Sequence, residues 1–199
     1  MKSPLCEPNS ILVRLREETR AEHSAAARAI DLLNATLDIV YYRKVLDIFY
    51  GYYRPLENTI CEFGDWSEPS LSPHDRTKSH LLAEDISALG GASAELPLCA
   101  DVPHIAHTAD GLGCLYVLEG ATLGGQIICR HARDVLRLTP ATGCRFFHGY
   151  GERTGDMWRA FGTTLTGYAR DGATQDRVVA AARDTFVTLR QWCERGGIV

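Results

Sequence analysis

The stretch from Gly111 to Leu138 restricts the fold of this chain more than any other part of it. Its apolar residues, followed by charged ones, give the pattern of an amphipathic helix; they are Leu115, Leu118, Leu123, Ile127 and Ile128. Gly120, Gly124 and Gly125 interrupt this pattern. Each glycine inside a helix costs roughly 0.5 to 1 kcal/mol relative to alanine. Something therefore requires bare backbone at these positions.

Two hypotheses explain the glycines. In the first, Gly120 and Gly124 lie one turn apart and let a neighbouring helix approach closely. In the second, the three glycines kink the helix and let a flat, bulky ligand lie where side chains would otherwise project. Spacing alone does not separate the two.

The rest of the chain predicts an all-α fold. Helical patterns cover residues 10–35, 37–62, 73–89, 104–138, 156–169 and 174–194, with Pro55 expected to bend or interrupt the second helix. Residues 92–103 are expected to form a loop and residues 141–155 a connection across the surface. No alternating, β-branched run bounded by turns is present.

Length and composition fit one domain. A chain of 199 residues that is 45% hydrophobic can bury a single sizeable core. We expect a loose lead-in over residues 1–10 and a multi-helix bundle over residues 11–195.

Charge and cysteine content exclude several classes of function. The net charge is only −4 and no lysine-rich or arginine-rich run occurs, which argues against a nucleic-acid partner. No uncharged apolar run of 18 residues and no secretory signal are present, so we expect no membrane association. The seven cysteines are an odd number without a CxxC pair, which is typical of reduced thiols in a cytoplasmic protein.

His23 is the candidate ligand of the first predicted helix. It shares an apolar face with residues spaced by three or four, so its ring is expected to point inward; they are Leu12, Leu15, Thr19, Ala26, Ile30 and Leu33. Such a histidine is either a packed core residue or an axial ligand of heme iron. No second metal-ligating side chain stands one turn away on this face, so a zinc or di-iron site is not expected.

Three segments carry a resemblance to a known family. LREETRAEH, from Leu15 to His23, resembles the proximal-helix motif of heme oxygenases, in which a threonine precedes the axial histidine by four residues. LYVLEGATLGGQ, from Leu115 to Gln126, resembles the glycine-rich distal helix of the same family. This motif and GYGERTGDMWRAF, from Gly149 to Phe161, are most similar to the bacterial branch associated with bacteriophytochromes. The resemblance extends over residues 11–195.

The resemblance implies a site for heme b, which would be substrate and cofactor together. His23 would ligate the iron, and the backbone at the catalytic Gly120 and Gly124 would lie close over the porphyrin. The other residues implied to bind heme are Arg16, Thr19, Tyr116, Gly125, Arg159 and Phe186. Of these, Arg16, Tyr116 and Arg159 would hold the propionates, whereas Phe186 would wall the pocket.

The implied reaction consumes O2 and external electrons and opens the porphyrin ring to biliverdin, carbon monoxide and ferrous iron. A distal side without strong proton donors suits this chemistry, because such donors would promote cleavage of the O–O bond. The chain shows no flavin, nicotinamide or iron–sulfur motif, so electrons are expected from a ferredoxin or flavodoxin-like donor with its reductase. A bacteriophytochrome that receives the biliverdin is a further expected partner.

Two positions depart from the family pattern. Many members carry a glutamate four residues after the axial histidine, where this chain has Ala27. Animal-type members carry an aspartate one residue after the first distal glycine, where this chain has Ala121.

Two alternative functions stay open from the sequence. One is a protein that binds heme or another tetrapyrrole without turning it over. The other is a thiamin-hydrolysing enzyme of similar all-α topology, which requires a pocket cysteine such as Cys114 with a nearby carboxylate.

Overall fold

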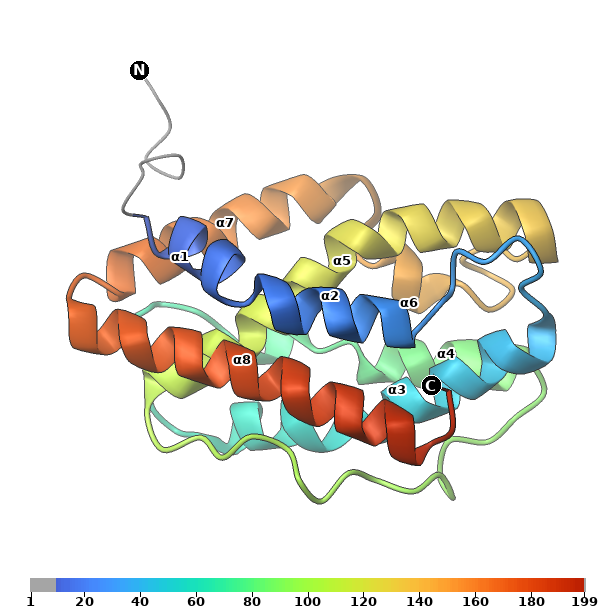
Figure 1. The fold of residues 1–199 in the computed structure, drawn as a ribbon, viewed down its shortest axis with the longest axis horizontal. Helices are drawn as coiled ribbons and strands as arrows, with labels where there is room; N and C mark the ends of the chain where they lie inside the picture. Colours follow the sequence, from blue (N-terminus) through green and yellow to red (C-terminus); the bar gives the residue numbers. More distant parts are fainter. Residues whose placement is uncertain (1–9, 199) are drawn as a thin grey trace.

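The computed structural model describes residues 10–198, which form helices and connections without a strand (Figure 1). The predicted all-α, single-domain fold is confirmed. Apart from Ser10, the predicted lead-in lies outside the described residues. The helices are α1 (Ile11–Glu18), α2 (Arg20–Ala29), α3 (Ile39–Glu62), α4 (Ser79–Ala88), α5 (Thr108–Leu136), α6 (Arg145–His148), α7 (Thr154–Tyr168) and α8 (Gly172–Arg195), with 3-10 turns η2 (His74–Arg76) and η3 (Gly151–Arg153).

Helix α5 occupies the centre of the bundle. It packs most extensively against α8 and also contacts α6 and α7, while α2 packs on α8 and α3 packs on α4. Its most apolar part has a mean hydropathy of 1.4 and is long enough to cross a membrane, but half of that part is buried. Such burial is typical of the core helix of a soluble fold. In Figure 1, α2 and α5 run in the same general direction and diverge toward the C-terminal end of α5.

The first predicted helix is broken in two at Thr19. The Thr19 hydroxyl donates to the Leu15 carbonyl oxygen over 2.7 Å, and its backbone leaves helical geometry with φ −106° and ψ 8°. A threonine that bonds back to the preceding turn often bends a helix. The helix begins as predicted, with Ser10 as its N-cap, but its second part ends at Ala29. A single helix over residues 10–35 was therefore a wrong prediction.

Pro55 lies inside α3 without interrupting it, so of the two predicted effects, a bend or an interruption, the interruption does not occur. Proline lacks the N–H that would donate to the carbonyl of the residue four positions earlier, which is Gly51. The backbone N–H of Cys99 instead donates to the Gly51 carbonyl oxygen over 2.8 Å. The loop around Cys99 thus supplies the hydrogen bond that Pro55 lacks, and the helix continues.

Two further segments differ from the sequence prediction because of buried carboxylates. The helix predicted over residues 73–89 begins only at Ser79, where Glu57 accepts hydrogen bonds from the backbone of Lys78 and Ser79. The connection over residues 141–155 contains α6, whose first N–H groups donate to the Asp85 carboxylate over 2.7 and 2.8 Å. Each carboxylate satisfies donors that a helix start leaves free.

Candidate functional site

One side of α5 presents bare backbone and exposed apolar side chains. We call this side the ligand face. Its residues lie three or four positions from at least one other member, and they are Tyr116, Gly120, Leu123, Gly124 and Ile127. Leu123 is 41% exposed and Ile127 is 50% exposed. A Cβ atom added at Gly124 would meet nothing within 4 Å, and one added at Gly120 would meet only the edge of Trp158, at 3.8 Å. No backbone of a neighbouring helix lies within 4 Å of these two Cβ positions, so close helix packing does not account for the glycines.

Gly125 differs from the other two glycines, because it points away from the ligand face. A Cβ atom at this position would lie 2.7 Å from the Phe147 carbonyl oxygen. The glycine therefore lets α6 approach α5 closely, which is a packing role. The prediction that Gly125 belongs to the ligand-binding set is not supported by this placement.

Contacts with the α1–α2 segment and the loop after it bound the ligand face at both ends. At one end the Tyr116 hydroxyl lies beside the Thr19 side chain. At the other end a ring nitrogen of His131 lies 2.9 Å from the Asn34 carbonyl oxygen. Tyr116 and His131 are fifteen residues apart, which corresponds to about 22 Å of helix. Between these contacts Leu123, Gly124 and Ile127 are exposed.

His23 occupies α2, one turn after Thr19, and its side chain is exposed. Its ring meets the ring of Phe186 edge-on, with centroids 5.6 Å apart and planes at 90°. The ring therefore does not enter the core as predicted, although Thr19 and Ala26, one turn away on the same face, are buried. The imidazole projects from α2 one turn beyond the contact between Thr19 and Tyr116, and Gly120 lies one turn beyond Tyr116 on α5.

Arg16, Thr19 and Tyr116, three of the residues predicted to bind heme, lie close to one another. Burial raises the pKa of the Tyr116 phenol, while the Arg16 cation and the Thr19 side chain oppose that rise. Arg16 is exposed, whereas Thr19 is buried. One guanidinium and one phenol therefore lie at the Tyr116 end of the ligand face, where they could bind an anionic group.

Arg159 is not part of this group in the structure. Its side chain is 65% exposed and pairs with Asp156 of its own helix, α7. The neighbouring Trp158, which sequence reasoning missed, instead lies over Gly120, with its ring 5.8 Å from that of Tyr116. A lone tryptophan in an amphipathic helix gives no signal that distinguishes a site wall from ordinary core.

Sequence reasoning also missed a buried ionic cluster beside the ligand face. Glu119, only 1% exposed, accepts hydrogen bonds from Arg76 over 2.6 Å, Lys78 over 2.5 Å and the Tyr150 hydroxyl over 2.7 Å. Burial and the nearby Glu119 carboxylate raise the pKa of Tyr150. The one acidic residue in an otherwise apolar run, Leu115 to Gly120, was the available signal. The acid adjacent in sequence to Gly120 is thus bound to cations.

Cys114 does not provide the nucleophile that a thiamin-hydrolysing enzyme would need. The thiol is completely buried, and burial raises its pKa to about 12. A protonated thiol without access to substrate is unreactive. Among the residues from 10 to 198, no three His, Cys, Asp or Glu side chains are placed to share a metal ion.

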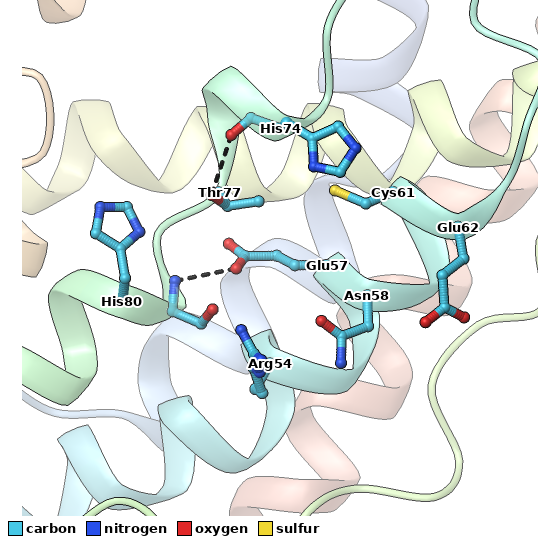
Figure 2. A pocket seen from close by; sticks show the side chains of 9 residues that line it. Arg54, Glu57, Asn58, Cys61, Glu62, His74, Thr77 and His80 are labelled. Atoms are coloured by element: carbon cyan, nitrogen blue, oxygen red, sulfur yellow. Dashed lines mark hydrogen bonds between the residues drawn. The ribbon is translucent and has the colours of Figure 1, made fainter.

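A polar hollow of about 340 Å³ lies elsewhere, between α3 and the segment from η2 to α4 (Figure 2). Its lining consists of Arg54, Glu57, Asn58, Cys61, Glu62, His74, Thr77, Ser79 and His80. None of these residues belongs to the predicted site. The buried carboxylate in its wall, Glu57, is already bonded to the backbone of α4.

Comparisons with known proteins find a matching family model and similar folds. The family model described as heme oxygenase matches residues 9–195. The fold is similar to the NO- and CO-bound heme oxygenase of Neisseria meningitidis, with 18% identity, a TM-score of 0.79 and coverage of 94% of this chain and 92% of that one.

Two further solved structures are similar. Heme oxygenase-1 from Synechocystis sp. PCC6803, in complex with heme, has 21% identity, a TM-score of 0.75 and coverage of 94% and 91%. Heme oxygenase from Leptospira interrogans has 18% identity, a TM-score of 0.72 and coverage of 94% and 99%. A search of curated protein sequences found no match.

Proposed function

Because this chain belongs to the heme oxygenase family, whose enzymes degrade heme, we propose that heme b binds between α2 and the ligand face of α5. The observations that carry this assignment are the open backbone at Gly120 and Gly124 and the exposed imidazole of His23, each one or two turns beyond the contact between Tyr116 and Thr19. A neutral imidazole on a helix is an ordinary axial ligand of heme iron. We assign His23 that role.

The residues around this space fit the substrate. Leu123 and Ile127 expose apolar surface that a porphyrin plane would cover, and the missing side chains at Gly120 and Gly124 leave the plane room. At the Tyr116 end of the ligand face, Arg16 and Tyr116 offer a cation and a phenol to the propionates. Arg159 is paired with Asp156, so we do not include it in the clamp.

Bound heme supplies the iron at which O2 reacts, and we propose that the products are biliverdin, carbon monoxide and ferrous iron. On the distal side, the chain contributes a surface without acidic or basic side chains that are free to donate a proton. Gly120 and Gly124 carry no acid or base, and the adjacent Glu119 is bonded to Arg76 and Lys78. A heme held here would meet no strong proton donor from Gly120, Gly124 or Glu119 that could promote cleavage of the O–O bond, and the backbone at the two glycines would border the space in which O2 reacts.

Phe186 substitutes in part for the carboxylate that is absent at Ala27. An axial histidine is normally held in one orientation by a group outside the metal's own ligands. Here the edge-on contact with the buried Phe186 ring restricts the imidazole from one side. The contact fixes orientation by shape and leaves the ring nitrogens free to bind iron or water.

Electrons are proposed to come from a ferredoxin or flavodoxin-like donor with its reductase. Arg16, Arg20 and Arg28 are exposed along α1 and α2, on the helices that carry His23, and would attract an acidic donor. We further propose that the enzyme is cytoplasmic and belongs to the branch that supplies biliverdin to a bacteriophytochrome. These assignments are supported by the sequence motifs rather than by a contact in the structure.

Addition of one equivalent of heme, followed by ascorbate in air, tests the function directly. Loss of the Soret band with the appearance of a biliverdin spectrum is expected. A Soret band that persists through the reaction would instead identify a protein that binds heme without degrading it.

A further inference from the structure

Glu119 has a role that the heme site itself does not explain. Its carboxylate lies in the interior, and each of its oxygens faces a cation, with Arg76 at 2.6 Å from one and Lys78 at 2.5 Å from the other. Both cations are buried as well, and Tyr150 donates a further hydrogen bond. Three polar side chains from two separate segments, Arg76 with Lys78 and Tyr150, therefore converge on one residue of α5.

The cluster is anchored to the rest of the fold on its far side. The Lys78 ammonium also donates to the Arg76 carbonyl oxygen over 2.8 Å, and the Lys78 backbone N–H donates to Glu57 of α3 over 2.6 Å. The Arg76 guanidinium lies over the Phe161 ring at 5.7 Å. Glu119 is thus connected to α3, α4 and α7 rather than to one flexible partner.

The position of this cluster along α5 is what gives it a function. Glu119 directly precedes Gly120, and the glycines of the ligand face have no side chains with which to fix the helix by packing. Buried ion pairs contribute little net stability compared with apolar residues of similar volume, and fixing one arrangement is a use attributed to them. The ion pairs of Glu119 therefore fix α5 next to Gly120, where the ligand face has no side chain that could do so.

We propose that Glu119 is a positioning residue, which through Arg76 and Lys78 fixes the path of α5 at Gly120 and so sets how closely the backbone approaches the bound porphyrin. This inference rests on the proposed heme site. The effect of Glu119 on the path of α5 exists in the ligand-free protein as well, so it can be tested without heme.

The test compares Glu119→Gln with the wild-type protein by amide hydrogen exchange in the absence of heme. The substitution keeps the size of the side chain and removes its charge. Exchange at residues 117–125 is expected to become at least about tenfold faster, because local opening of the helix is no longer opposed by the ion pairs. Tyr150→Phe removes one hydrogen bond without changing any charge, and is expected to produce a smaller increase at the same amides.

Asp85→Asn provides the matched control. Asp85 is as buried as Glu119, but its carboxylate holds the start of α6 and not α5. The control should lower the unfolding temperature and speed exchange in residues 145–148, while exchange in residues 117–125 stays within about twofold of wild type.

The heme complexes give the second readout. In Glu119→Gln the yield of biliverdin per heme should fall about tenfold and the C–O stretch of the ferrous carbon monoxide complex should shift, while the heme dissociation constant changes less than about threefold. Asp85→Asn should leave both the yield and the stretch unchanged.

Wild-type exchange at residues 117–125 in both Glu119→Gln and Tyr150→Phe would overturn the proposal, as would equal effects on these amides in Asp85→Asn. Failure of the proposed function gives a different result, because wild-type protein would then bind no heme whatever the exchange data show.

Discussion

The imidazole of His23 on α2 contacts the ring of Phe186 on α8 edge-on, with centroids 5.6 Å apart. Phe186 is buried and His23 is exposed, so the pair joins the core of the bundle to the open side of the site. Packing against Phe186 thus fixes the imidazole on one side, while the residue as a whole stays exposed.

Replacing this aromatic ring should weaken both the fold and the site. Phe186→Ala is expected to lower the free energy of unfolding by about 3 kcal/mol, the usual cost of removing a buried phenylalanine ring. It should also broaden the Soret band of the heme complex, because His23 loses the contact that orients it. Urea unfolding and absorption spectra measure the two effects, and a variant with wild-type spectra would show that Phe186 serves stability alone.

Gly124 and Gly125 of α5 should respond differently to substitution. Gly124→Ala adds a methyl group to open space and should stabilise the ligand-free protein by roughly 0.5 to 1 kcal/mol. Gly124→Leu should leave folding intact and weaken heme binding at least about tenfold, because the side chain fills the space of the porphyrin.

Gly125→Ala is the control for these variants. Its Cβ atom would lie 2.7 Å from the Phe147 carbonyl oxygen, so it should destabilise the protein by about 1 to 3 kcal/mol. Thermal unfolding and heme titration of Gly124→Ala, Gly124→Leu and Gly125→Ala measure these effects on stability and heme binding. Equal stabilities for Gly124→Ala and Gly125→Ala would refute the distinct roles given to these glycines.

Stability should decrease in alkaline solution because of buried phenols. Burial raises the pKa of Tyr42, Tyr52 and Tyr53 in the folded protein far above the ordinary value of 10.0. Above pH 10 the unfolded chain loses these protons and the folded protein keeps them, so the free energy of unfolding falls as pH rises. Absorbance at the tyrosinate band should show that these three phenols ionise only as the protein unfolds.

Cys114 should be chemically silent. Burial raises its pKa to about 12, so at pH 8 iodoacetamide should not label it in the folded protein. Cys114→Ala should degrade heme at the wild-type rate. Loss of activity in this variant would revive a mechanism based on a cysteine nucleophile.

Much of this arrangement could be predicted from the sequence because it depends on local patterns. The period of the apolar residues indicates the helices, and the cost of three glycines in one helix indicates that the backbone is needed bare. The spacing of Thr19 and His23, with the glycine-rich run, was specific enough to indicate the family.

What the sequence did not reveal depends on partners distant along the chain. The continuity of α3 through Pro55 depends on one hydrogen bond from Cys99. The break at Thr19 is an exception, because it accompanies a local hydrogen bond to Leu15 that the apolar pattern does not show. Gly124 and Gly125 are neighbours with the same composition around them, and only the position of α6 separates their roles. The partners of Glu119 likewise come from segments about 30 and 40 residues away, at Tyr150, Arg76 and Lys78.

A structure of the heme complex tests the central assignment most directly. The account predicts the iron at bonding distance from a ring nitrogen of His23, with the opposite side of the porphyrin covered by the backbone at Gly120 and Gly124. It would be contradicted by heme iron bound through another side chain, or by a porphyrin seated away from α5, for example in the polar hollow beside Glu57 (Figure 2).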